Sequence, residues 1–320
     1  MAKRTYSRKG SKIQPSVLTM AFQTPLNISG TNSYTIDLSQ AASILNRRFY
    51  RQGINWAVAG FKIFSSTGTS GTIQISKLPN TWVLSNAWEK GFRAWQRQQR
   101  EALEDGSQES VKAKFNDFKI FADSFHLSQG VAGNLLPTDS LSVQALPGEW
   151  EASQIVIPNY GSPGTNYEPF LIAVGADVAG VGGAVSLIAA YQNSRGVPQS
   201  PDPAVPVGVT NADNIYRAMF DVGDNNQEVM DNVIGKNDEL PYDQDDYPGG
   251  PLNMPNLELH DRAFVTSTTI GDQSNLKGGN FPCGLVRFQF SNTEDTTYYI
   301  HVDLIPGEHR GYLCEPMTEM

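Results

Sequence analysis

The chain has 320 residues, of which 39% are hydrophobic and 18% charged, with a formal net charge of −9 at pH 7. The hydrophobic share is enough for a sizeable core in one large β domain or two smaller ones. The two cysteines, Cys283 and Cys314, are too few for a disulfide-rich fold and lack metal-ligand spacing, so we expect two reduced thiols. The acidic balance argues against a protein that binds nucleic acid over its whole surface.

The first twelve residues differ from the remainder because they are basic and contain no acid. The five positive residues are Lys3, Arg4, Arg8, Lys9 and Lys12. This arm has too few apolar side chains to fold, and no apolar run follows it, so it is not a signal peptide. We interpret residues 1–12 as a disordered arm that contacts phosphates. A solubility tail or a nuclear-import signal is the alternative.

The next elements along the chain are strands with one short helix between them. We predict strands at residues 17–22, 56–64 and 72–78 and a helix at residues 39–51. In the third strand Ile73 and Ile75 share one face, and polar residues occupy the other. This alternation is typical of a strand that is half-buried in an antiparallel sheet.

A longer helix is predicted at residues 86–104. Asn86 is expected to cap it, with Glu89 completing a capping box three residues later. Trp88, Phe92 and Trp95 recur at helical spacing and form one apolar stripe, which indicates a buried face.

Three arginines of the same helix, Arg93, Arg97 and Arg100, share another face. They could form a basic stripe that faces nucleic acid. The alternative is a solvated face with internal ion pairs between residues 89 and 93, 97 and 101, and 100 and 104. We favour the paired face because three acids lie beside the three arginines.

Residues 170–190 are apolar over 21 positions, and Asp177 is their only charge. That length could span a bilayer, but four glycines interrupt the middle of the segment. We therefore predict two buried strands, residues 170–174 and 184–190, joined as a hairpin. A further strand is predicted before them at residues 154–157. No membrane insertion is expected.

A loop insertion is predicted at about residues 194–255, which contain eight prolines. Nine acidic residues and one basic residue lie between positions 221 and 246. Asp243, Asp245 and Asp246 could supply oxygen ligands to Ca²⁺, but they lack EF-hand spacing. We favour a solvated acidic loop.

The C-terminal part contains a strand at residues 263–270 and two regular strands at residues 286–290 and 298–304. The last two alternate strictly, with Phe288 and Ile300 on their apolar faces. Residues 291–296 between them are polar, which predicts a hairpin loop. About ten strands are expected in all.

No catalytic constellation is apparent. None of the four histidines has the spacing of a metal site, and no nucleophile elbow, phosphate loop or dinucleotide fingerprint occurs. No pair of carboxylates is singled out for glycoside hydrolysis. We expect no enzyme activity and no cofactor.

Two blocks resemble segments of capsid proteins from small circular single-stranded DNA (CRESS-DNA) viruses. The first is KLPNTWV followed by SNAWEKGF, at residues 77–83 and 85–92, and the second is HVDLIPGEHRGY, at residues 301–312. The resemblance implies a jelly-roll subunit that self-assembles into an icosahedral shell around circular DNA, without enzyme activity. Many such proteins carry a much longer Arg-rich arm, and five charges are few for a packaged genome, so other basic surface such as Arg93, Arg97 and Arg100 is a candidate for helping to hold it.

We therefore predict an all-β viral jelly roll, with two antiparallel sheets of eight core strands plus extras, one or two inserted helices and long loops. Residues 1–12 would be the arm and residues 13–320 the capsid domain. Its partners would be further copies of itself and viral single-stranded DNA, with an unidentified host receptor. We expect it in the virion and, during assembly, inside the host cell, the nucleus included.

Two other functions fit the same composition. Jelly rolls with basic arms also enclose RNA genomes, so the protein could be the capsid protein of an RNA virus. A carbohydrate-binding or carbohydrate-active β-sandwich is the second alternative. Its candidate sugar platforms are the tryptophans Trp56, Trp82, Trp88, Trp95 and Trp150.

Overall fold

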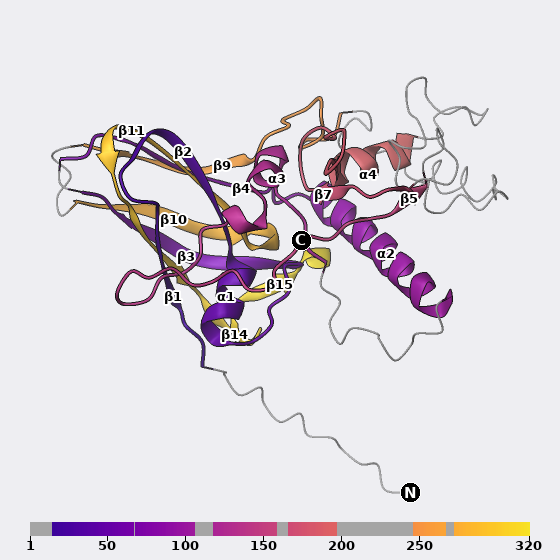
Figure 1. Cartoon of the computed structure of the whole chain (residues 1–320), viewed down its shortest axis with the longest axis horizontal. Coiled ribbons are helices and arrows are strands. Elements are labelled where there is room, and N and C mark those ends of the chain that lie inside the picture. Colours follow the sequence, from indigo (N-terminus) through magenta and orange to yellow (C-terminus); the bar gives the residue numbers. More distant parts are fainter. Residues whose placement is uncertain (1–14, 67, 106–117, 159–165, 197–245, 267–271) are drawn as a thin grey trace, which may run out of the picture.

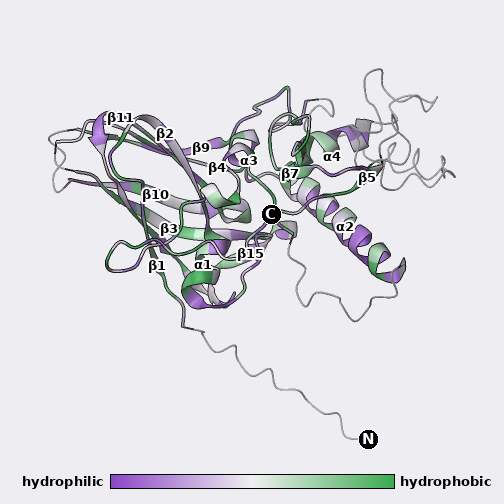
Figure 2. Cartoon of the chain, viewed as in Figure 1, coloured by the Kyte–Doolittle hydropathy of each residue, from purple (hydrophilic) through white to green (hydrophobic). Residues whose placement is uncertain are grey.

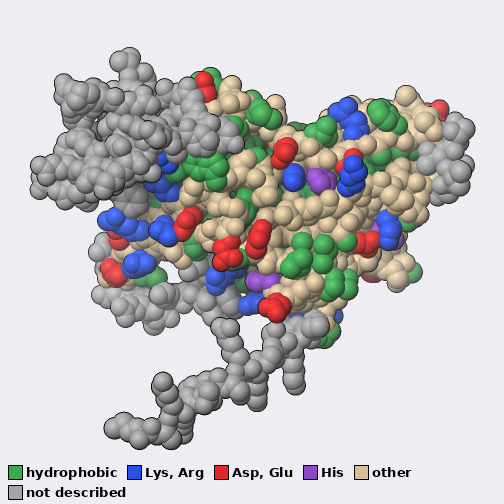
Figure 3. Space-filling view, turned by 180° about the vertical axis from the view of Figure 1, so that it is seen from behind, with side chains coloured by type: hydrophobic (Ala, Val, Ile, Leu, Met, Phe, Trp, Pro, Cys, Tyr) green, Lys and Arg blue, Asp and Glu red, His purple; other side chains and the backbone are tan. Residues whose placement is uncertain are grey.

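The computed structural model describes residues 15–66, 68–105, 118–158, 166–196, 246–266 and 272–320. This part of the chain is mainly β, with two antiparallel sheets and a smaller helical lobe beside them (Figure 1). Helix α2 carries both hydrophobic and hydrophilic residues along its length (Figure 2). On the face seen in Figure 3, side chains of both charges are interspersed.

The first sheet, sheet A, has the strand order β1-β12-β3-β10, with β15 also paired to β3. Its strands are β1 (Thr19–Gln23), β12 (Tyr299–Leu304), β3 (Ile54–Phe64), β10 (Gln273–Phe281) and β15 (Cys314–Pro316). The second sheet, sheet B, has the order β2-β11-β4-β9. Its strands are β2 (Ile28–Asp37), β11 (Leu285–Thr296), β4 (Gly71–Lys77) and β9 (Glu258–Val265). All of these pairings are antiparallel.

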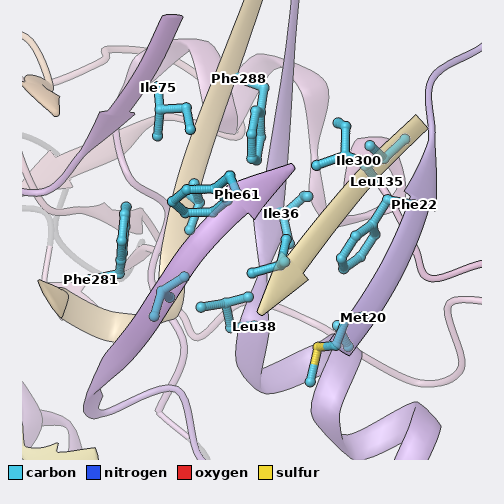
Figure 4. Packing of buried hydrophobic residues seen from close by; sticks show 14 of the residues in the cluster. Met20, Phe22, Ile36, Leu38, Phe61, Ile75, Leu135, Phe281, Phe288 and Ile300 are labelled. Atoms are coloured by element: carbon cyan, nitrogen blue, oxygen red, sulfur yellow. The ribbon is translucent and has the colours of Figure 1, made fainter. Parts of the chain in front are cut away.

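One hydrophobic core lies between the two sheets (Figure 4). Phe61 of sheet A contacts Phe288 of sheet B edge to face, with ring centroids 5.6 Å apart. Phe61 meets Phe281 in the same way at 5.4 Å. Edge-to-face pairs add about 1 kcal/mol each to the free energy gained by burying the rings. The alternation of apolar residues in these strands therefore places their side chains in one shared core.

The strands predicted at residues 17–22, 56–64, 72–78, 286–290 and 298–304 are confirmed, with ends shifted by a few residues. Sequence reasoning missed β2 and β10. The sequence of β2, ISGTNSYTID, and that of β10, QSNLKGGNF, contain few apolar residues. Both pair with strongly apolar neighbours, β11 and β3, and this pairing defines them as strands.

The predicted hairpin between β11 and β12 is wrong. Strand β11 continues through Thr296, and β12 belongs to the other sheet, so the connection crosses from one sheet to the other. The polar side chains buried at this corner are hydrogen-bonded to one another, which compensates for their loss of water. The Tyr298 hydroxyl donates to Asn292 Oδ1 at 2.6 Å, and the hydroxyls of Thr69 and Thr296 lie 3.1 Å apart.

The remaining elements surround these sheets or lie in the chain between β4 and β9. Helix α1 (Leu38–Asn46) lies between β2 and β3, and the 3₁₀ turn Pro282–Gly284 lies between β10 and β11. After β12 come β13 (Pro306–Gly307), β14 (Gly311–Tyr312) and the 3₁₀ turn Met317–Glu319. The helices between β4 and β9 are α2 (Trp82–Asp105), α3 (Ser124–Gln129), the 3₁₀ turn Val131–Gly133 and α4 (Leu187–Gly196). The short strands there are β5 (Ile157–Pro158), β6 (Asn166–Tyr167), β7 (Phe170–Ile172) and β8 (Ala184–Ser186). This inserted lobe has a hydrophobic cluster of its own.

Both predicted helices exist, with different ends. Helix α1 begins at Leu38, is capped by Asp37, and ends where Arg47 takes a left-handed conformation. Helix α2 begins at Trp82, where the hydroxyl of Thr81 accepts the N–H of Leu84. The capping box predicted at Asn86 is therefore wrong. The apolar stripe is confirmed, since Trp88 is buried and its neighbours on the stripe pack against the lobe's cluster.

The hairpin predicted within residues 170–190 is corrected. Strands β7 and β8 pair in parallel, and α4 begins at Leu187 instead of a continued strand. Between them the chain folds back on itself, because Val178 bridges Ala184 and the Asp177 carboxylate accepts the N–H of Ser186 at 2.7 Å. Within the described ranges, no helix is long and apolar enough to cross a membrane.

Candidate nucleic-acid interface and assembly surfaces

The five basic residues of the predicted arm, Lys3, Arg4, Arg8, Lys9 and Lys12, lie outside the described residues. The described chain begins beside α1 and the β13–β14 turn, which fix its first residues. Ser16 Oγ donates to the carbonyl of Gly311, and the N–H of Val17 donates to Asn46 Oδ1 at 3.0 Å. The Tyr312 hydroxyl donates to the carbonyl of Val17 at 2.7 Å. The first described residues are therefore held at a defined place on the folded body.

Arginines from two parts of the chain lie near these first described residues, and sequence reasoning missed them. We call Arg47, Arg48, Arg51 and Arg310 the arginine cluster. Arg48 donates to the carbonyl of Pro15 at 3.3 Å, and Arg310 donates to the carbonyl of Phe49. Burial, and then the charges of Arg310 and Arg51, lower the pKa of His309. These contacts place arginines from two distant parts of the chain around the first described residues.

On α2, the three arginines predicted as a weaker nucleic-acid stripe, Arg93, Arg97 and Arg100, are all exposed. Arg93 pairs with Glu89, and Arg97 pairs with Glu101 at 2.7 Å. These two predicted intrahelical pairs are confirmed. Because each pair is internally neutral, this face offers less uncompensated positive charge than the arginine cluster.

A groove of about 290 Å³ lies between the arginine cluster and α2. Arg51 lines it on one side, and Arg93 and Glu89 line it on the other. Its apolar wall includes Phe92, whose ring stacks on that of Trp88 with a centroid distance of 5.0 Å. The groove therefore has an aromatic wall and a charged lining of two arginines and one glutamate.

A second, wider groove of about 700 Å³ lies on the outer face of sheet B. At its base Arg287 makes a two-point ion pair with Asp123, at 2.7 and 3.0 Å. The ring of Phe125 covers the guanidinium at 4.6 Å. Polar side chains from the strands, such as Gln74 and Gln289, line the remainder of this groove.

The predicted sugar platforms are less open than that function would require. Trp56 and Trp88 are buried, and the indole of Trp56 donates to Ser39 Oγ at 3.1 Å. The remaining tryptophans, Trp82, Trp95 and Trp150, are partly buried. All five contribute to packing.

Burial shifts the pKa values of several titratable groups in the described interior. Burial raises the pKa of Asp37 to about 6 and lowers that of His126 to about 4. Burial also raises the pKa of both free thiols, that of Cys314 to about 12. No group of three or more potential metal ligands occurs among the described residues, which exclude Asp243 and Asp245 of the predicted acidic loop.

Two exposed apolar surfaces are well ordered by hydrogen bonds or strand pairing. The first is the loop at residues 139–146, where Leu141 and Leu146 are 81% and 84% exposed. The Asp139 carboxylate accepts the N–H groups of Leu141 and Val143 at 2.9 Å, which holds the loop closed. The second is strand β9, where Phe264 is 73% exposed. Such ordered apolar side chains mark surfaces that other molecules can cover.

No family model matches the chain, and no curated protein or solved structure shows significant similarity to it.

Proposed function

We propose that the protein is a viral capsid protein whose jelly-roll body self-assembles into an icosahedral shell around a single-stranded DNA genome. The strand order is the observation that carries this proposal. The eight core strands, in chain order, are β1, β2, β3, β4, β9, β10, β11 and β12. If they are numbered one to eight, sheet A has the order one, eight, three, six, and sheet B has the order two, seven, four, five. This interleaved order is the one expected of a jelly roll, the architecture of many viral capsid domains, and it supports the proposal.

The positions of the insertions and loops support an assembling subunit. The large insertion falls in one connection, between β4 and β9, and leaves both sheets intact. The apolar loop at residues 139–146 is anchored beside edge strand β1 by a hydrogen bond from the N–H of Thr138 to the carbonyl of Ala21 at 2.8 Å. An apolar projection that fits a different surface on the next copy makes a heterologous contact, and when the rotation of such a contact closes it makes a ring from which a shell can be built.

The sequence supports a nucleic-acid cargo. Five positive charges lie within twelve residues that contain no acid, whereas the whole chain is acidic. One such arm would bind a polyanion weakly, but many arms inside one shell would bind it strongly through multivalency. The two blocks that resemble CRESS-DNA virus capsid proteins fall on β4 to α2 and on β12 to β14.

Electron microscopy of the purified full-length protein tests the proposal. We expect closed particles under some condition of salt and pH. A protein that stays monomeric under all of them would overturn it. Deletion of residues 1–12 should leave particle formation intact and lower the ratio of absorbance at 260 nm to that at 280 nm. Sequencing the enclosed nucleic acid then distinguishes DNA from RNA.

Carbohydrate binding is a second candidate because of the open polar groove on sheet B. Amide side chains, the exposed edge of Phe125 and the Arg287–Asp123 pair are groups that can bind sugar hydroxyls. Binding of the isolated subunit to a glycan array, abolished by Gln289→Ala, would favour this candidate. Binding of no glycan would leave assembly as the function of the fold.

A further inference from the structure

We propose that single-stranded nucleic acid binds to the folded body as well as to the arm, along a path from the arginine cluster into the groove beside α2. On this path Arg47, Arg51 and Arg310 contact phosphates, and one base enters the groove against Phe92. The inference rests on the proposed function, because it names the body surface that would hold the genome.

Three arginines of the cluster, Arg47, Arg51 and Arg310, are exposed. Within the described ranges, no carboxylate lies at ion-pair distance from Arg47, Arg51 or Arg310, although Arg97 and Arg287 each have one. Glu308 is exposed in the turn that carries Arg310, and its backbone carbonyl accepts the N–H of Arg310 at 2.9 Å. Arginines that lack a carboxylate partner within the described ranges form a site that favours phosphate over cations.

The cluster is continuous with the arm. Arg48 and Arg310 are tied by hydrogen bonds to the backbone of Pro15 and Phe49, and Ser16 is tied to the carbonyl of Gly311. The cluster therefore lies beside the first described residues, which follow the basic residues 1–12 in the sequence. This continuity addresses the small number of charges in the arm, since the body adds cations at the point where the arm ends.

Arg51 belongs to both the cluster and the groove, so a strand on the cluster lies at the mouth of the groove. The groove volume of about 290 Å³ is at the lower end for small-molecule sites, which fits one base better than a larger ligand. Phe92 is partly exposed and stacks on Trp88 behind it, so its ring is a rigid platform. Stacking of a base on an aromatic ring contributes about 1–3 kcal/mol and tolerates any sequence.

The negative charge of Glu89 should weaken nucleic-acid binding at the groove. Its carboxylate lines the groove and pairs with Arg93. A phosphate near the groove would be repelled by Glu89, and Arg93 is occupied by it. Replacing Glu89 with glutamine removes the repulsion and releases the arginine, so nucleic-acid binding should become tighter.

The experiment measures binding of the full-length protein to a fluorescent dT oligonucleotide over a series of salt concentrations. The variant Arg47→Gln/Arg51→Gln/Arg310→Gln should lose about 2 from the slope of log K against log salt, at about 0.7 per lost phosphate contact. At 0.1 M salt its affinity should fall at least tenfold. Glu89→Gln should raise the affinity, and Phe92→Leu should lower it for dT but not for inorganic polyphosphate.

The matched control is Arg262→Gln, which removes one exposed arginine from sheet B and should leave the salt slope unchanged. Particle formation is recorded for every variant. An unchanged slope in the triple variant, in a protein that assembles and binds dT, would overturn the inference alone. A wild-type protein that neither assembles nor binds dT would overturn the proposed function itself. If Phe92→Leu lost equal affinity for dT and for polyphosphate, the proposed stacking of a base on Phe92 would be wrong.

Discussion

Asp37 and His126 are connected by hydrogen bonds through two residues, Gln40 and Asn134. The Asp37 carboxylate accepts the backbone N–H of Gln40 at 3.2 Å, and Gln40 Oε1 accepts from Asn134 at 3.0 Å. Asn134 Oδ1 lies 2.8 Å from His126 Nε2, while His126 Nδ1 accepts the N–H of Ala122. The neutral imidazole therefore carries its proton on Nε2. This chain of contacts joins the start of α1 to the inserted lobe.

These two groups make opposite contributions to the dependence of stability on pH. The folded-state pKa of Asp37 is raised to about 6, so its contribution is fully present below about pH 4 and is lost as the pH rises through 6. The folded-state pKa of His126 is lowered to about 4, so its contribution is present above pH 6.5 and is lost as the pH falls through 4. Each shift of about two units corresponds to about 3 kcal/mol, and the two nearly cancel between pH 4 and 6.

We predict that single substitutions reveal this cancellation. In Asp37→Asn, the free energy of unfolding should fall more steeply than in wild type as the pH drops from 6 to 4, because His126 is then uncompensated. In His126→Gln, the free energy of unfolding should rise relative to wild type as the pH drops from 6 to 4. Urea unfolding at several pH values measures both slopes. Equal slopes in all three proteins would contradict the assigned pKa shifts.

The Arg287–Asp123 pair is expected to stabilise the seam between sheet B and α3. Both side chains are largely buried, at 11% and 15% exposed, and Asp123 also accepts the N–H of His126 at the start of α3. Asp123→Ala leaves the guanidinium without its partner and should cost about 3 kcal/mol of unfolding free energy. The control is Glu101→Ala, which breaks a pair that is about half exposed and should cost less than about 1 kcal/mol. Comparable losses in the two variants would show that burial does not strengthen the first pair.

Gly53 permits the close packing of Trp88 against the turn after α1. A Cβ atom at position 53 would overlap the Trp88 ring, whereas one at Gly60 would lie 3.4 Å from the carbonyl of Leu276 in ordinary contact. We expect Gly53→Ala to lower the free energy of unfolding by about 1–3 kcal/mol through overpacking. Gly60→Ala should change it by less than about 0.5 kcal/mol. Denaturant titration compares the two variants, and tolerance of alanine at both positions would show that the ring moves freely.

The loop at residues 139–146 should affect assembly but not folding. Leu141 and Leu146 are more than 80% exposed, so Leu141→Ser/Leu146→Ser should change the unfolding free energy by less than about 0.5 kcal/mol. If the loop contacts a neighbouring copy, the same variant should yield far fewer particles. Size-exclusion chromatography with electron microscopy measures the yield. A normal yield of particles would show that these side chains face solvent in the shell.

Local patterns were enough to predict much of the β framework. Strict alternation in β4, β11 and β12 predicted which residues enter the core, because side chains on a strand point alternately to its two faces. The stripe of Trp88, Phe92 and Trp95 predicted the buried face of α2 for the corresponding helical reason. Strands β2 and β10 were missed because they are defined by partners that lie far away in the sequence.

The sequence by itself determined the basic arm, the acidic body and the residues of the core, since these depend on composition and local period. Only the tertiary structure decided that β11 and β12 lie in different sheets, because sheet membership depends on pairing between distant strands. It also decided where cations gather on the body. Arg47 and Arg51 are separated from Arg310 by more than 250 residues. Folding of α1 against the β13–β14 turn brings them together, and no local pattern encodes that contact.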